Sequence, residues 1–462
     1  MFPAKIYSQR RNVLKSKFNS GLLLFLGNEE SSMNYTDNTY AFRQDSTFLY
    51  YWGIDSPSLA AVMDIDSGKE MVFGKDPTVD EIVWTGPQIL LRKKAEATGV
   101  KESFELKKLS EFLEEAVRKG RKIHYIRQYR PENILKIEQL LDIPAARVNT
   151  SASTEFMKAV IEQRSIKSKE EIGQIEIGVN ITREMQMAAM QKTKPGMYER
   201  EIAGMMHGIA LARGGNLSFP IIFSIHGETL HNHSHHNKMK SGDLVVNDCG
   251  AESPLHYAGD LTRTFPVSGK FTSKQKEIYE IVLRAQKKAI SMISPEVKFK
   301  DVHLTACKTL FDGLKELGLM KGDTEEAVKA GAHAIFFQCG TGHMMGLDVH
   351  DMENLGEEFI GYDENVQRSD QFGMCYLRLA KPLQPGFVVT VEPGIYFIPE
   401  LYHAWKAEKK HESFINYKKL AGYMDFGGVR IEDDVLVLPT GNKVLGKKLA
   451  KTVSEIESAC SR

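Results

Sequence analysis

The chain has 462 residues, of which 42% are hydrophobic and 26% charged, and its 60 basic residues balance its 60 acidic ones. This composition is that of a globular protein, and the neutral net charge gives no indication of the basic surface that nucleic-acid binding needs. The longest apolar stretches are far below the ~18 residues that cross a bilayer, and the five cysteines are too scattered for a disulfide framework. We therefore expect a cytoplasmic protein with neither nucleic acid nor membrane as a partner.

The first third of the chain alternates short apolar runs with one amphipathic stretch. The runs predict strands at residues 22–26, 59–63 and 71–73, and the apolar spacing in residues 107–119 predicts a helix. Alternating strands and helices are typical of an α/β domain. A charged stretch that begins at Glu162 leads into a long helical segment, so we place a domain boundary at 155/156, between domains 1–155 and 156–462.

The second domain is expected to combine long helices with buried strands, in an α/β (α+β) arrangement. Apolar spacing predicts helices at residues 273–292 and 301–318. Strands are predicted at residues 243–248, 260–267, 387–392 and 429–438. On the last of these, Arg430, Glu432 and Asp434 would share one face.

Each of these four strands carries an acidic residue in an apolar setting; the residues are Asp248, Asp260, Glu392 and Glu432. A buried carboxylate without a partner costs several kcal/mol, so four that converge would need cations, and two divalent ions would balance their charge. His343, in a glycine-rich segment, is the candidate imidazole ligand, and His350 could face the same cavity. Such an oxygen-rich set suits Mn²⁺, with Co²⁺ or Fe²⁺ as alternatives, better than a thiolate zinc site.

Ordered motifs around these residues resemble the pita-bread metallopeptidases. The motifs are Asp248-Cys-Gly-Ala-Glu, Asp260-Leu-Thr-Arg-Thr-Phe-Pro-Val, Gly-His343, Leu-Asp-Val-His350-Asp, Thr-Val-Glu392-Pro-Gly-Ile-Tyr and Gly-Val-Arg-Ile-Glu432-Asp-Asp. Upstream, residues 40–53 resemble the N-terminal domain of creatinase and aminopeptidase P, which methionine aminopeptidases lack. The resemblance implies an N-terminal creatinase/aminopeptidase P-like α/β domain followed by a pita-bread catalytic domain.

The resemblance also implies residue roles. Asp260 and Glu432 would bridge two metal ions, Asp248 would complete one of them, and His343 with Glu392 would complete the other. A hydroxide held between the metals would attack the substrate, and Glu392 would move its proton. His231 and His350 would contact the substrate. Arg430 and Tyr396 would support the metal ligands.

The resemblance further implies cleavage of the bond before proline. We expect an Xaa-Pro aminopeptidase, because residues 40–53 and the Asp260 motif look most like aminopeptidase P. The alternative is a prolidase, an Xaa-Pro dipeptidase, which has an insert like residues 396–426 and an arginine that matches Arg378 and binds the dipeptide carboxylate. A remote alternative is a non-catalytic binding module, which the complete ligand set disfavours.

Two further residues bear on completeness of the site. Trp84 resembles a tryptophan that in relatives reaches a neighbouring subunit's active site, so we expect a homodimer or homotetramer; the alternative is a half-buried aromatic side chain. Cys339 stands where relatives have a histidine, four residues before His343. A neutral thiol cannot donate like an imidazolium, so handling of the substrate would change.

Overall fold

The computed structural model describes residues 1–461, which cluster into two compact units. The first comprises Met1–Arg164 with Asn354–Gly356, and the second comprises Ser165–Glu353 and the chain from Glu357 onward. The domain boundary expected at 155/156 falls inside helix α8, Thr154–Ser165. That the chain divides there into two domains stays a prediction. No helix among residues 1–461 combines the length and the apolar character that a bilayer span requires.

The first unit is built on a five-stranded sheet of order β4-β3-β2-β1-β5. The strands are β1 Leu22–Leu26, β2 Ala60–Asp64, β3 Glu70–Gly74, β4 Glu102–Glu105 and β5 Ile123–His124. The helices are α1 Ala4–Lys15, α2 Ser46–Trp52, α3 Val79–Thr85, α4 Leu91–Ala97, α5 Lys108–Arg118, α6 Pro131–Leu141, α7 Ala145–Val148 and α8. The three predicted strands and the predicted helix at 107–119 are confirmed.

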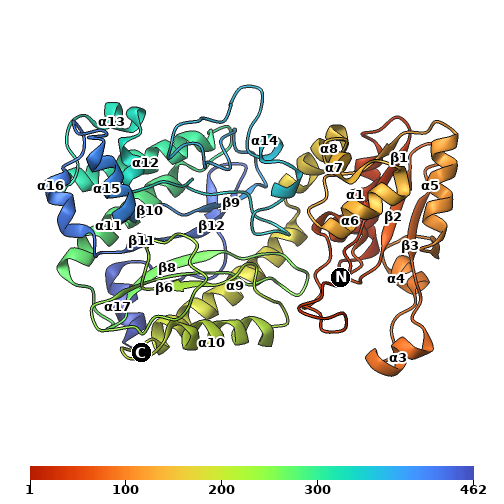
Figure 1. The fold of residues 1–462 in the computed structure, drawn as a ribbon, viewed down its shortest axis with the longest axis horizontal. Coiled ribbons are helices and arrows are strands. Elements are labelled where there is room, and N and C mark those ends of the chain that lie inside the picture. Colours follow the sequence, from red (N-terminus) through yellow and green to blue (C-terminus); the bar gives the residue numbers. More distant parts are fainter. Residues whose placement is uncertain (462) are drawn as a thin grey trace. The chain divides into compact units, whose positions relative to one another are not determined.

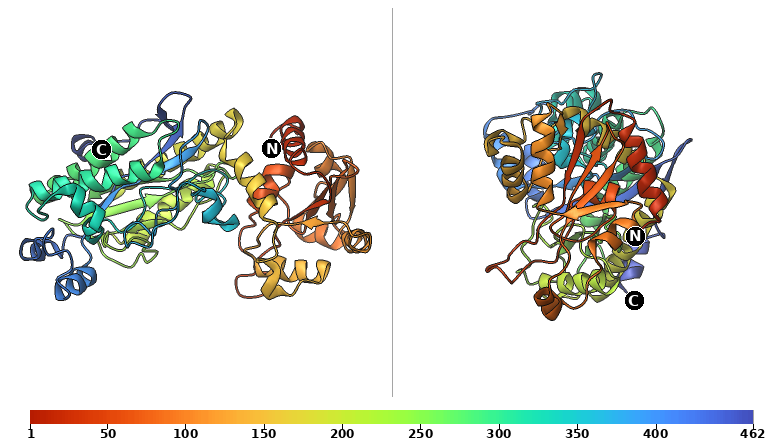
Figure 2. Two further views of the ribbon diagram at one scale, coloured as in Figure 1. Left: turned by 90° about the horizontal axis from the view of Figure 1, so that it is seen from above. Right: turned by 90° about the vertical axis from the view of Figure 1, so that its right-hand side faces the viewer.

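Strand β1 is apolar throughout because both faces of the sheet are covered (Figure 2). Leu22, Leu24 and Leu26 pack with residues of α5 and α6 in one core cluster. On the other face, Phe25 packs against Trp52 of α2 and Phe156 of α8 at ring-centroid distances of 5.5 and 5.1 Å. The apolar run therefore reflects two cores, one on each side.

The second unit places short sheets between two helix pairs (Figure 1). The pairs are α9 Lys169–Lys192 with α10 Glu199–Ala212, and α11 Ser273–Met292 with α12 Phe299–Glu316. Capping boxes start α9 and α11 at Ser168 and Thr272. The smaller helices are α13 Thr324–Ala330, α14 Glu357–Ile360, α15 Pro399–Ala407, α16 Tyr417–Leu420 and α17 Val453–Cys460.

The strands of the second unit form three small sheets, and each helix pair is followed by strands. The sheets are β6-β7-β8, β13-β12-β9 and β10-β11. Their members are β6 Ile222–Ser224, β7 Leu244–Cys249, β8 Leu261–Pro266, β9 Val388–Val391, β10 Gly394–Tyr396, β11 Gly428–Arg430, β12 Asp433–Val437 and β13 Asn442–Val444. The insert at 396–426 contains α15 and α16 between β10 and β11.

The predicted single strand at 429–438 is wrong, because the chain changes pairing partner within it. Strand β11 pairs with β10, whereas β12 pairs antiparallel with β9. Between them, the Glu432 amide donates to the carbonyl of Thr262 at 3.1 Å, which ties this break to β8. Arg430, Glu432 and Asp434 therefore do not share one face of a continuous strand. The break brings Glu432 to the strand that follows Asp260.

Candidate active site

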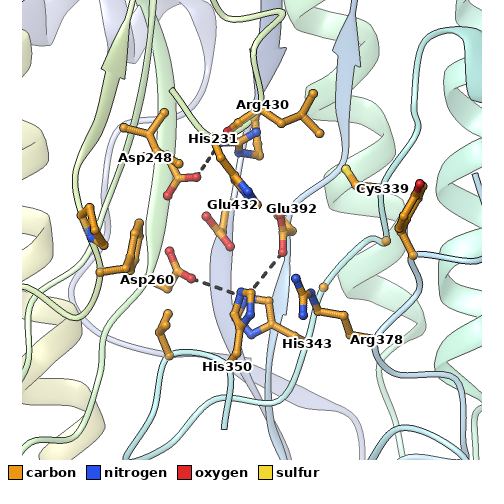
Figure 3. Close-up of a pocket in the computed structure, with 18 of the residues that line it drawn as sticks. His231, Asp248, Asp260, Cys339, His343, His350, Arg378, Glu392, Arg430 and Glu432 are labelled. Atoms are coloured by element: carbon orange, nitrogen blue, oxygen red, sulfur yellow. Dashed lines mark hydrogen bonds and ion pairs between the residues drawn. The ribbon is translucent and has the colours of Figure 1, made fainter. Parts of the chain in front are cut away.

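Four acidic residues and one histidine converge where strands of the second unit end (Figure 3). Asp248 lies near the end of β7 and Asp260 directly precedes β8. Glu392 directly follows β9, and Glu432 lies in the break before β12. Asp248 still belongs to the β7 ladder, whereas the other three acidic residues lie just outside their strands, so residues far apart in sequence meet here.

His343 reaches the same place from a glycine-rich loop. Its backbone pairs with Thr390 of β9: the Thr390 amide donates to the His343 carbonyl at 3.0 Å, and the His343 amide donates to Thr390 Oγ1 at 3.1 Å. A Cβ added to Gly342 would lie 2.0 Å from the Thr390 carbonyl oxygen, so only glycine permits this approach. His343 Nε2 then lies 3.5 Å from Asp260 Oδ2 and 3.6 Å from Glu392 Oε1.

The donor set fits divalent metal ions. Nδ1 of His343 lies 3.1 Å from the Met344 carbonyl, and a hydrogen bond there fixes the tautomer that leaves Nε2 free to coordinate. Ligand atoms of Asp260, His343 and Glu432 lie within 4.8 Å of one another. Asp248 Oδ1 and Asp260 Oδ1 are buried without a hydrogen-bond partner among residues 1–461. Unsatisfied buried carboxylate oxygens beside a free imidazole nitrogen are the features that a bound cation explains.

The electrostatics agree with this fit. Burial, followed by the charges of neighbouring carboxylates, raises the pKa values of Asp260 and Glu432 well above those of free side chains. Burial also raises the pKa of Glu392. Arg430 is the protein's own cation here: its Nη2 lies 2.5 Å from Asp248 Oδ2, and its Nη1 donates to the Tyr396 hydroxyl at 2.8 Å. One guanidinium does not balance four carboxylates, so added cations would relieve the repulsion.

A cavity of about 550 Å³ opens onto these carboxylates. Its lining includes the predicted substrate-contacting residues His231, His350 and Arg378, together with Cys339. The rings of His343 and His350 are 4.1 Å apart between centroids. Burial lowers the pKa values of His231 and His350, so both rings favour the neutral form. Burial raises the pKa of Cys339 to about 12, which keeps it a neutral thiol.

Glu353, which sequence reasoning missed, links two of these residues. Its Oε2 lies 3.1 Å from His350 Nδ1 and accepts from Arg378 Nη1 at 2.5 Å. Arg378 Nη1 also donates to Glu357 at 3.1 Å. Burial opposes ionisation of Glu353, but the hydrogen bond from His350 and the positive charge of Arg378 hold its pKa at about 2. The spacing of three residues from His350 was the only sequence signal.

Replacing Glu353 should reveal this pairing as a pH-dependent stability. The depressed pKa means that ionised Glu353 stabilises the fold above the unfolded-state value of about 4.3, and that this contribution is lost as the pH falls toward 2. We expect Glu353→Gln to lower the free energy of unfolding by up to about 3 kcal/mol at pH 7. Urea unfolding at pH 7, 5.5, 4 and 3 should show that the difference in free energy of unfolding between wild type and variant, the gap, closes only below about pH 4.5. A gap that is constant to pH 3 would instead mean a loss of packing.

Trp84 lies in the first unit, on α3, and does not line the cavity of the second unit. The alternative of a half-buried aromatic is wrong, because Trp84 is 86% exposed. Two neighbours on the same helix, Val79 and Val83, are 77% and 73% exposed. Helix α3 thus presents an apolar surface.

Comparisons with known proteins agree with the fold and the site. A model of metallopeptidase family M24 matches residues 173–439, and a model of the aminopeptidase P N-terminal domain matches residues 7–125. The site defines a metallopeptidase, a hydrolase with a divalent-metal centre, and the chain belongs to metallopeptidase family M24. The expected fold class, an aminopeptidase P-like α/β domain followed by a pita-bread domain, is confirmed.

Similar proteins carry two different activity names. The Xaa-Pro dipeptidase of Homo sapiens is 31% identical over 452 residues, covering 95% of this chain and 88% of the relative. The Xaa-Pro aminopeptidase of Haemophilus influenzae is 30% identical over 470 aligned residues, covering 99% of this chain and 97% of the relative. The structure of zinc-substituted aminopeptidase P from E. coli in complex with product matches with a TM-score of 0.82 and 27% identity. The match covers 100% of this chain and 98% of that one.

Proposed function

We propose that this protein is an Xaa-Pro aminopeptidase, which removes the first residue of peptides whose second residue is proline. The observation that carries the proposal is the convergence of Asp248, Asp260, His343, Glu392 and Glu432 on one cavity. Similarity to Xaa-Pro peptidases over nearly the whole chain supports the substrate class. The bond before proline is a tertiary amide without an N–H, so a site that attacks it cannot depend on gripping that group.

The five convergent residues would hold two divalent cations. When bound, such cations supply Lewis acidity and lower the pKa of water. Mn²⁺ is the metal we propose, because the donors are four carboxylates and one imidazole. Arg430, held between Asp248 and the Tyr396 hydroxyl, would keep Asp248 in the orientation that coordination requires.

The protein's own groups would carry the protons. Glu392, whose pKa is raised by burial, would accept a proton from the attacking water and pass it to the proline nitrogen as the peptide bond breaks. Glu353 is ionised, so His350 Nδ1 would donate to it and leave Nε2 available to the substrate. His231, on the cavity rim beside Asp248 and Arg430, would contact the peptide from the other side.

Arg378 separates the aminopeptidase from the dipeptidase alternative. Its Nη1 already contacts two carboxylates, Glu353 and Glu357, so its charge is balanced within the protein and it anchors His350 through Glu353. This favours the aminopeptidase, which needs no group for a C-terminal carboxylate. The dipeptidase alternative is supported by the place of Arg378 in the cavity lining, since its other nitrogens could receive a dipeptide carboxylate in a bidentate pair.

Two peptides distinguish these functions. Protein stripped of metal and reloaded with Mn²⁺ should have a higher kcat/KM for Ala-Pro-Ala than for Ala-Pro. In the Arg378→Lys variant, both substrates should lose activity by a similar factor, because the variant disturbs Glu353 and His350. A preference for Ala-Pro, with an Arg378→Lys loss confined to the KM of the dipeptide, would identify a prolidase.

We propose that two or four copies of the chain associate through the apolar surface of α3. Exposed apolar side chains grouped on one short helix are typical of interaction sites. Light scattering should give the mass of a dimer or tetramer, and Trp84→Ala should lower kcat/KM for Ala-Pro-Ala about tenfold or more if Trp84 completes a neighbouring site. A monomeric wild type with unchanged activity in Trp84→Ala would contradict this.

The cytoplasmic location stays a prediction, which cell fractionation can test.

A further inference from the structure

A second group of metal-binding side chains lies in the second unit, outside the lining of the cavity. His303 and Cys307 are on α12, and His333 is on the short 3₁₀ helix η1, Ala332–Ile335. His303 and Cys307 are completely buried and His333 is 3% exposed. None of the three belongs to the motifs of the proposed active site, and the proposed peptidase reaction does not use them.

The geometry of the three side chains approaches that of a coordination sphere. Residues four apart on a helix share a face, so His303 and Cys307 point the same way, and Cys307 Sγ lies 3.4 Å from His303 Nε2. One ligand atom from each of the three residues lies within 4.8 Å of the others. Around a zinc ion, with Zn–S of about 2.3 Å and Zn–N of about 2.0–2.1 Å, neighbouring ligand atoms are about 3.4–3.7 Å apart. The helical pair already meets this spacing, and a ligand atom of His333 lies within 4.8 Å of both.

His333 is the member whose ring nitrogens are least well satisfied by hydrogen bonds. Neither of its ring nitrogens has a hydrogen-bond partner of good geometry among residues 1–461, although the Val328 carbonyl lies close enough to favour a proton on the ring. An unsatisfied buried polar group costs about 1–3 kcal/mol. Burial holds the pKa values of His303 and His333 at about 3 and 4, so both rings are neutral and keep a lone pair for coordination.

His303 also has a hydrogen-bond partner at the ring nitrogen that would face away from the metal, as metal-bound histidines do. Its Nδ1 lies 2.8 Å from the hydroxyl of Thr341, which leaves Nε2 directed at Cys307. A hydrogen bond to the far ring nitrogen holds the ring of a ligating histidine in place, and the Thr341 hydroxyl can make it as donor or acceptor. The Thr341 carbonyl in turn accepts from the Glu392 amide at 2.8 Å, so the group is one residue removed from the proposed active site.

We propose that His303, Cys307 and His333 form a second metal site, which takes a thiophilic cation, Zn²⁺ or Cu⁺. One thiolate and two imidazoles are soft to borderline ligands, in contrast to the oxygen-rich set around Asp260. Binding replaces the S–H bond of Cys307 by a metal–sulfur bond and releases that proton to solvent. A cation here would tie η1 to α12 and, through Thr341, stiffen the loop that carries His343.

Cobalt gives a readout that is specific for this site. Co²⁺ bound to thiolate has a near-ultraviolet sulfur-to-metal charge-transfer band, and the proposed peptidase ligands contain no sulfur. We expect the band to appear and saturate when metal-stripped full-length protein is titrated with Co²⁺. Zn²⁺ or Cu⁺, added anaerobically, should abolish the band, whereas Mn²⁺ should not; whichever of the two does so at lower concentration is the preferred cation.

Matched cysteine variants locate the band. Cys307→Ser and His333→Gln should each remove it, while Cys339→Ser, in the cavity wall, and Cys460→Ser, in α17, should keep it. Circular dichroism of each metal-stripped variant checks folding. Absence of the band from the wild type, or its loss in Cys339→Ser but not in Cys307→Ser, would overturn the proposal. Because the readout is spectroscopic, failure of the peptidase proposal would leave this result unaffected.

Discussion

Glu432→Gln should abolish peptidase activity and yet stabilise the metal-free protein. Glu432 is 2% exposed and lies among Asp248, Asp260 and Glu392. Burial is the main cause of its raised pKa, and the charges of these three carboxylates raise the pKa further. Glutamine keeps the shape and can still accept from Thr262 Oγ1, which donates to Glu432 at 2.7 Å. Removing one of four mutually repelling charges should raise the melting temperature of metal-free protein. The same change removes a proposed metal ligand, so kcat/KM should fall by more than about 100-fold, beyond the usual effect of outer-sphere residues.

Calorimetry with and without Mn²⁺ tests both halves of this expectation. Wild-type protein should gain a large increase in melting temperature on Mn²⁺ addition, because the ions bind only the folded state. Glu432→Gln should begin higher and gain much less. Asp434→Asn is the matched control: Asp434 is equally buried and accepts from the Asp260 amide at 3.0 Å, but it is not a proposed ligand. A Glu432→Gln variant with normal activity and a normal Mn²⁺ response would contradict the ligand assignment.

Arg430→Met should shift the stability of the metal-free protein in the opposite direction. Arg430 is 3% exposed, and its guanidinium contacts Asp248 and the Tyr396 hydroxyl. Removing one partner of a buried ion pair leaves an uncompensated charge, which costs about 3–5 kcal/mol. Because bound cations would replace the lost positive charge next to Asp248, Mn²⁺ should restore part of the loss.

The measurement is the free energy of unfolding by urea, with and without Mn²⁺. Arg430→Lys is the matched control, since it keeps the charge but not the forked geometry, and should lie between wild type and Arg430→Met. Stability unchanged in Arg430→Met, or a loss that Mn²⁺ does not reduce at all, would show that Arg430 does not balance this carboxylate cluster.

Local patterns predicted the fold where each pattern had one structural solution. An uninterrupted apolar run identified β1, and helical spacing identified α11 and α12 within a few residues. The strand at 429–438 was predicted wrongly because apolar alternation continues through Ile431 although the pairing partner changes there. Pairing is a tertiary property, and alternation records only which residues are buried.

The proposed ligands could be found from sequence because an acidic residue inside an apolar strand is costly enough to need a reason. Their convergence, and the cavity that also contains His350 and Arg378, required the resemblance or the structure. Glu353 was missed because its role depends on where Arg378 lies, 25 residues away. The group of His303, Cys307 and His333 was missed for the same reason, since nothing in the sequence places η1 beside α12.

The most direct test of a dinuclear Xaa-Pro peptidase is a Mn²⁺ titration of metal-stripped protein, with hydrolysis of Ala-Pro-Ala and of Ala-Ala-Ala followed at each step. We expect no hydrolysis without metal, and Ala-Pro-Ala hydrolysis that rises and saturates at two bound Mn²⁺ per chain, with Ala-Ala-Ala left intact. Hydrolysis that persists fully in metal-stripped protein, or no cleavage of Ala-Pro-Ala at any Mn²⁺ occupancy, would contradict the proposed function.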